Sequence, residues 1–126
     1  MSILPSKDRR YLSVRGIAYR EVEQGGQKGV ILTGFPLPDG KFQVSQANIL
    51  IVLPPGYPDA PPDMFYAVPH LLLVAGKRAP RATQVQMNFV GQNWQRWSRH
   101  NNQWRPGADG LWTMIKRIEV ALEVAA

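Results

Sequence analysis

The spacing of apolar residues predicts a helix at the N-terminal end of the chain, over residues 7–14. Ser6 is expected to cap this helix, because its hydroxyl can accept a hydrogen bond from the free amides of the first turn. Gly16 supplies a stop signal. The apolar side chains expected to face inward are Leu4, Tyr11, Leu12 and Val14.

A second helix is predicted at the C-terminal end, where apolar residues keep helical spacing on one face. Asp109 is expected to cap it. The residues of the apolar face are Leu111, Ile115, Ile118, Leu122 and Ala125.

Between the helices, apolar residues in short runs or near period two predict four strands of an antiparallel meander. These strands cover residues 17–22, 29–35, 47–53 and 63–68. Gly25 and Gly26 predict a tight turn within a hairpin. Asp39 and Gly40, beside two prolines that cannot donate to a ladder, predict another turn.

The segment 54–62 reads PPGYPDAPP and predicts a rigid, irregular connection between the third and fourth strands. Tyr57 is its expected packing anchor. Alternation at residues 85–89 is consistent with a further short strand, whereas residues 94–106 show no clear period. We therefore expect an α+β fold in a single domain over residues 1–126: N-terminal helix, four-stranded antiparallel meander, long loop and C-terminal helix.

Composition fits an ordinary globular protein, with 44% hydrophobic and 19% charged residues in 126 positions. No apolar run is long enough to span a bilayer and the N-terminus lacks an apolar signal core, so we expect a cytoplasmic location. The formal net charge of +6 favours an acidic partner without identifying it.

The chain contains no cysteine, which excludes disulfides, thiolate metal sites and thiol nucleophiles. Its two histidines, His70 and His100, have no recognisable ligand spacing with Asp63 or Asp109. We therefore expect neither a metal site nor a cofactor.

Two motifs give the chain its resemblance to a known family. The matching residues are Tyr57, Pro58, Pro61 and Pro62 in a Tyr-Pro-x-x-Pro-Pro turn, and Trp104 and Pro106 in a later Trp-x-Pro. The order of elements and these motifs resemble the ubiquitin-conjugating enzyme (UBC) superfamily, in a diverged prokaryotic branch. That resemblance implies a UBC-like fold, with a ubiquitin-like protein and a ThiF-like activating enzyme as partners.

The resemblance ends at the catalytic residues. Members of the family use a cysteine about eight residues before the Trp-x-Pro, preceded by a His-Pro-Asn whose asparagine stabilises the oxyanion. Counting eight residues back from Trp104 gives Arg96, and no His-Pro-Asn occurs in the chain.

One reading places a different nucleophile in the same loop. Ser98 would attack, His100 would act as its base, and Asn101 or Asn102 would serve as oxyanion donor. A serine hydroxyl needs such a base because its pKa is far above that of a thiol. The product would be an oxyester with the C-terminus of a ubiquitin-like protein. The competing structural reading makes Ser98 a turn residue and His100 a packing residue.

A second reading is a catalytically inactive variant that binds and positions its partners. Arg9 and Arg10 correspond to the helix by which the family meets its activating enzyme, and Asp59 and Ala60 are exposed candidates in the proline turn beside Tyr57. Solvated surface charge is the simpler interpretation of the two arginines.

A third reading, ranked last, is binding of single-stranded nucleic acid. The segment 94–105 interleaves tryptophans with arginines, as stacking and phosphate contacts require. Trp97 is the candidate contact residue in this segment. Buried tryptophans that pack the loop are the alternative, because exposing an indole is costly.

Overall fold

The computed structural model describes residues 3–100 and 103–126. Its elements are α1 (Ser6–Arg15), β1 (Tyr19–Gln24), β2 (Gln27–Pro36), β3 (Gln46–Leu53), β4 (Phe65–Val68), a short 3-10 turn (Ala75–Lys77), β5 (Gln86–Phe89), β6 (Gln92–Trp97) and α2 (Leu111–Val124). The α+β fold, with a helix at each end of an antiparallel sheet, is confirmed. No helix among the described residues has the length and apolar character needed to cross a membrane.

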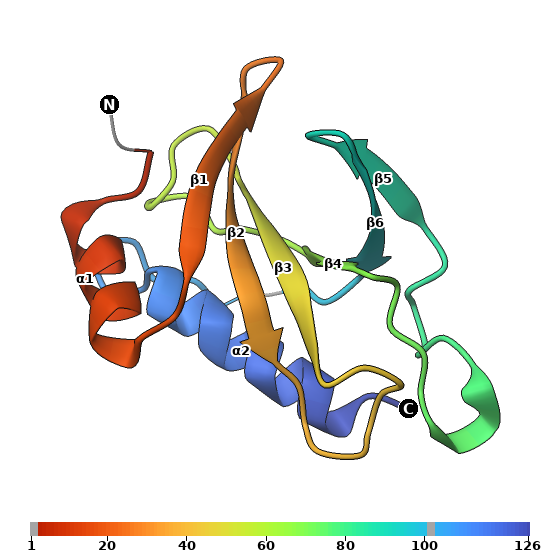
Figure 1. The fold of residues 1–126 in the computed structure, drawn as a ribbon. Helices are drawn as coiled ribbons and strands as arrows, with labels where there is room; N and C mark the ends of the chain where they lie inside the picture. The colour runs from red at the N-terminus through yellow and green to blue at the C-terminus, as the bar shows by residue number, and fades with distance from the viewer. Residues whose placement is uncertain (1–2, 101–102) are drawn as a thin grey trace.

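The strands form one sheet in the order β1-β2-β3-β4-β6-β5, and every pairing between neighbours is antiparallel. The four predicted strands are present as β1 to β4, although β4 begins at Phe65 and not at Asp63. The further short strand suggested at residues 85–89 is present as β5. The predicted long loop is wrong in part, because β6 also forms within it and extends the sheet beyond β4. Figure 1 shows the sheet strongly curled, with α2 lying across one face and α1 beside the β1 edge.

The central strands are buried on both faces. Along β2, Val30 and Leu32 contribute to the core beneath the helices, whereas Ile31 joins a second cluster on the opposite face. In β3, Ile49 and Ile51 face the helices and Leu50 faces away. This alternation follows from the two-residue period of a strand, and it explains why both strands read as almost continuous apolar runs.

The N-terminal helix begins and ends close to its predicted limits. Pro5, and not Ser6, occupies the N-cap position, and the carbonyl of Pro5 accepts hydrogen bonds from the first turn. Gly16 adopts a φ of 67° and ends the helix, as predicted. The expectation for Val14 is wrong: its side chain is 81% exposed.

The C-terminal helix buries the whole predicted apolar face. Its N-cap is Gly110, not Asp109. The amide of Leu111 donates instead to Oδ1 of Asp8 across 3.0 Å, so an acid from α1 satisfies a free amide at the start of α2.

The proline turn is packed through its tyrosine, as predicted. The hydroxyl of Tyr57 donates to Oδ2 of Asp8 across 2.6 Å, and its ring centroid lies 6.4 Å from that of Trp104. The Trp104 indole donates to the carbonyl of Pro58 across 2.9 Å. These contacts join the turn to α1 and to the segment that precedes α2.

Candidate functional site

Ser98 directly follows β6, and contacts of Trp97 and of its own amide fix the position of its backbone. The indole of Trp97 is fully buried, stacks on Phe65 with ring centroids 5.3 Å apart, and donates to Oε1 of Gln95 across 3.0 Å. The Ser98 amide donates to the carbonyl of Ala82 across 3.1 Å. The half-buried Ser98 side chain therefore starts from a fixed position at the end of a strand.

The predicted pair of Ser98 and His100 is in contact. Oγ of Ser98 lies 3.2 Å from Nε2 of His100. This is hydrogen-bond distance, and it is the geometry that a general base needs toward a hydroxyl nucleophile.

A third residue, Asp63, contacts the other ring nitrogen. Its Oδ1 lies 2.7 Å from Nδ1 of His100. The antiparallel pairing of β4 with β6 sets Phe65 opposite Trp97, and continuing this register brings Asp63 beside the segment that follows Ser98. Sequence reasoning considered Asp63 only as a metal ligand and missed this role. The available signal was its place at the end of the proline turn, two residues before β4.

A groove of about 360 Å³ opens beside His100, between α2 and the end of β6. Its apolar lining includes Phe65, Met114, Ile118 and Ala121. Three cationic side chains, Arg99, Lys116 and Arg117, also line it. The groove therefore suits a chain that carries apolar side chains together with negative charge.

The two arginines of the groove are partly withdrawn from water. Burial lowers the pKa of Arg99, and the nearby cation of Arg81 lowers it further. Burial also lowers the pKa of Arg117, whereas the negative charge of Asp63 raises it. Partly desolvated cations of this kind attract an anionic ligand more strongly than fully hydrated ones do.

A larger hollow of about 780 Å³ lies beside Asp63. It is lined by the β1–β2 turn, the proline turn, Asp63, Met64 and Tyr66. Burial raises the pKa of the Tyr66 hydroxyl, which Arg96 partly opposes. His100 thus lines one hollow and Asp63 lines the other.

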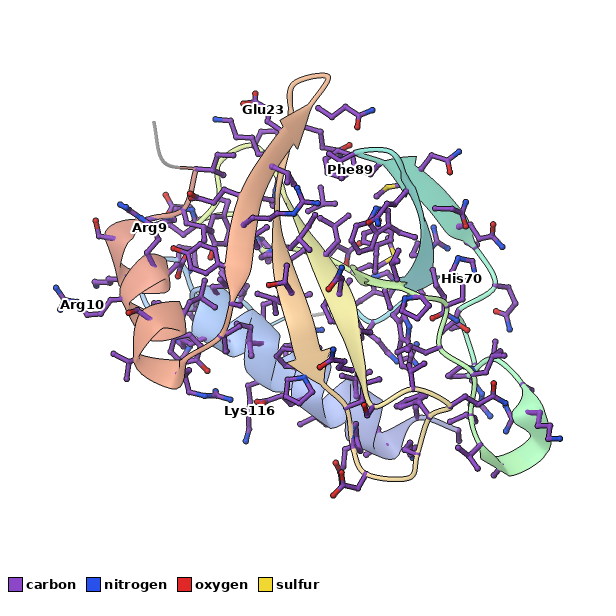
Figure 2. The ribbon with its side chains drawn as sticks, viewed as in Figure 1. Arg9, Arg10, Glu23, His70, Phe89 and Lys116 are labelled. Carbon is purple, nitrogen blue, oxygen red and sulfur yellow. The ribbon has the colours of Figure 1, made fainter. Side chains whose placement is uncertain are left out.

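The remaining sequence candidates lie in different surroundings. Arg9 is half-buried and Arg10 is exposed, and Figure 2 shows Arg10 pointing away from the sheet. Asp59 is exposed, while Ala60 and Tyr57 are half-buried in the same turn. Asn101 and Asn102, the proposed oxyanion donors, lie outside the described residues.

Burial excludes Trp94 and Trp97 as a stacking platform for nucleic acid. Trp94 and Trp97 are both 0% exposed, and they lie in the two separate cores. The alternative that these indoles pack the protein is confirmed, and the Trp97 side chain offers no surface to a partner. Within residues 3–100 and 103–126, no group of three or more histidines and acids is placed to hold a metal ion.

A family model described as Prokaryotic E2 family E matches residues 4–125. Neither a search of curated proteins nor a search of solved structures returned a match.

Proposed function

Because the chain belongs to prokaryotic E2 family E, we propose that it receives the C-terminus of a ubiquitin-like protein on Ser98 and passes it to a target amine. The chain is an E2-like protein of a prokaryotic conjugation pathway. It contains no cysteine, so a thioester cannot form on it. The single observation that carries the proposal is the 3.2 Å contact between Ser98 and His100, in the loop ahead of the Trp-x-Pro.

The proposed chemistry is acyl transfer in two steps. Oγ of Ser98 attacks the activated C-terminal carbonyl, its proton passes to Nε2 of His100, and the activating group leaves with the bonding electrons. The amine of the target then attacks the oxyester, and Ser98 recovers its proton as the amide forms. An oxyester is less reactive toward amines than a thioester, so we expect slow transfer.

The groove beside His100 supports this assignment. A flexible C-terminal tail that lies along it would place its last carbonyl next to Ser98. The apolar lining and the cations Arg99, Lys116 and Arg117 fit a tail with apolar and acidic residues. The larger hollow on the Asp63 side leaves room for the target amine.

The partners follow from the same proposal. A ThiF-like activating enzyme would deliver the ubiquitin-like protein, with Arg10 and the neighbouring Arg9 on α1 as its docking residues. Asp59, Ala60 and the edge of Tyr57 would contact partners at the turn, and Asn101 is the proposed oxyanion donor. We place this chemistry in a single UBC-like domain over residues 1–126, located in the cytoplasm, and we propose no cofactor.

The test is to incubate the protein with its ubiquitin-like partner, the cognate activating enzyme and ATP. We expect a covalent adduct that survives thiol, is cleaved by hydroxylamine and is absent from Ser98→Ala. Denaturing gels and mass spectrometry of the modified peptide measure it. Ser45→Ala, which removes an exposed hydroxyl far along the chain from the site, is the matched control and retains the adduct.

A different outcome supports the second candidate function, a scaffold that presents the ubiquitin-like protein without bonding to it. No adduct in any variant, together with measurable non-covalent binding, would establish presentation and exclude transfer through Ser98. The observation that favours this alternative is the absence of cysteine from the whole chain. Failure of both the adduct and the binding would exclude both functions.

A further inference from the structure

We infer that Asp63 is a positioning residue that completes a Ser98–His100–Asp63 relay and makes Ser98 reactive toward acyl and phosphonyl electrophiles. The inference rests on the proposed function for the identity of the nucleophile. It goes beyond the proposed function, because it assigns a role to Asp63 and predicts that Ser98 reacts in the absence of any protein partner.

The two contacts define which ring nitrogen holds the proton. Asp63 is an acceptor at 2.7 Å from Nδ1, so the neutral imidazole of His100 carries its proton there and donates it to Oδ1. Nε2 is then left with its lone pair, toward which Oγ of Ser98 donates across 3.2 Å. Without the carboxylate, the ring is free to adopt the other tautomer, in which Nε2 cannot accept a proton from Ser98.

The charges around the ring add a second role for the carboxylate. Arg99 follows β6 by two residues, and Lys116 and Arg117 lie on α2; all three line the groove beside His100. Positive charge from these elements opposes formation of the imidazolium during attack. Asp63 supplies the negative charge that offsets it, directly against the ring.

The proline turn places this carboxylate. Pro61 and Pro62 precede Asp63, and each fixes its own φ near −65°. Phe65, two residues later, is held by the ladder to Trp97. Asp63 is thus supported on both sides, although its side chain is 58% exposed and that of His100 is 57% exposed.

A fluorophosphonate probe tests this assignment without any partner. Oγ of Ser98 attacks phosphorus, the P–F bond breaks, fluoride leaves, and the proton of Ser98 passes through Nε2 to solvent. We expect labelling of the wild-type protein at Ser98, located by mass spectrometry.

Variants of Asp63 distinguish a role in positioning His100 from a role in the stability of the fold. Asp63→Asn should slow labelling by about tenfold or more, less than in a buried protease triad because this site is open to water. Asp63→Glu should recover part of the rate. Asp39→Asn, which neutralises an exposed acid in the β2–β3 connection, is the control and should label like the wild type.

The tautomer gives an independent readout by nitrogen NMR. The chain has two histidines, so a His70→Asn variant assigns the signals of His100. We expect an Nδ1-protonated ring in the protein with Asp63 and a tautomer mixture in Asp63→Asn, in samples whose circular dichroism is unchanged.

Two results would overturn the inference: absence of probe labelling at Ser98 in the wild type, or an Asp63→Asn labelling rate and His100 tautomer equal to those of the wild type. Neither result bears on whether the protein binds a ubiquitin-like partner. Conversely, labelling that depends on Asp63 would support the relay even if the adduct with a ubiquitin-like protein failed to form.

Discussion

At the scale of single residues, Asp8 connects three distant parts of the chain. Its side chain is 1% exposed, and its two oxygens accept from the Tyr57 hydroxyl and the Leu111 amide. A buried carboxylate is stable only when such donors satisfy it. Burial and the Asp8 hydrogen bond together raise the pKa of Tyr57, which keeps the phenol protonated as a donor.

We predict that Tyr57→Phe lowers the free energy of unfolding by about 1.5 to 3 kcal/mol, the range for a lost hydrogen bond to a charged group. The ring and its packing against Trp104 remain in this variant. Urea denaturation followed by tryptophan fluorescence measures the change. Tyr19→Phe is the matched control, expected within about 0.5 kcal/mol of the wild type. Equal stability of the two variants would show that the Asp8 contact contributes nothing.

At the scale of elements, the start of α2 depends on side chains that precede it. Asp109 does not cap the helix but accepts from the Arg105 amide across 2.8 Å and from the Thr113 hydroxyl across 3.0 Å. The Arg105 amide is the main reason that the pKa of Asp109 is lowered, with further contributions from Thr113 and the Arg105 side chain. The Asp109 carboxylate therefore links the segment before α2 to the first turn of α2 by hydrogen bonds.

The sign of the resulting pH dependence follows from linkage. A carboxyl group with a lowered pKa in the folded state stabilises the fold above its ordinary value of 3.8. That stabilisation is lost as the pH falls through the lowered value. We expect the stability difference between the wild type and Asp109→Asn to shrink below about pH 4.

Urea denaturation at a series of pH values checks this prediction. Asp39→Asn, in an exposed turn, serves as the comparison. A stability difference between the wild type and Asp109→Asn that stays constant from neutral to acidic pH would contradict it.

At the scale of the whole molecule, β6 joins two cores. Trp97 belongs to the core beneath the helices, and Trp94, three residues earlier, belongs to the cluster on the opposite face. Because an odd separation in a strand points two side chains to opposite faces, this one strand packs both layers. The candidate site lies directly after it.

We predict that Trp97→Ala costs about 3 to 5 kcal/mol, the usual loss for removing a buried aromatic side chain. That is a large fraction of the 5 to 15 kcal/mol that typically stabilises a folded protein. Thermal denaturation by circular dichroism measures it, with Trp112→Ala, at a half-buried position, as the comparison. A Trp97→Ala protein as stable as the wild type would contradict the burial seen here.

Sequence reasoning found the features that depend on near neighbours. The stop at Gly16, the turn at Gly25 and Gly26, and the meeting of Ser98 with His100 all involve residues close in sequence. It missed β6 because Trp94 and Trp97 are buried on opposite faces, which hides the two-residue period. The other four residues of β6 are polar, so the strand shows no apolar–polar alternation.

The contacts that sequence reasoning missed join residues far apart in the chain. Asp63 lies 37 positions from His100, and Asp8 lies 103 positions from Leu111. Neither pair has a local signature, because each forms only when the strands and helices have assembled. The resemblance to a family could not supply Asp63 either, since it carried over the turn motif and not a partner for a histidine.

The exposure of the His100–Asp63 pair has a consequence for the lifetime of any acyl group on Ser98. Water can reach the same ester carbonyl that a target amine must reach, and the same imidazole would activate it. Without a bound partner, the ester on Ser98 would therefore be hydrolysed. A partner that covers the site would exclude water and preserve the ester. The yield of the amide product would then depend on the time between ester formation and transfer to the amine, and not on the reactivity of Ser98.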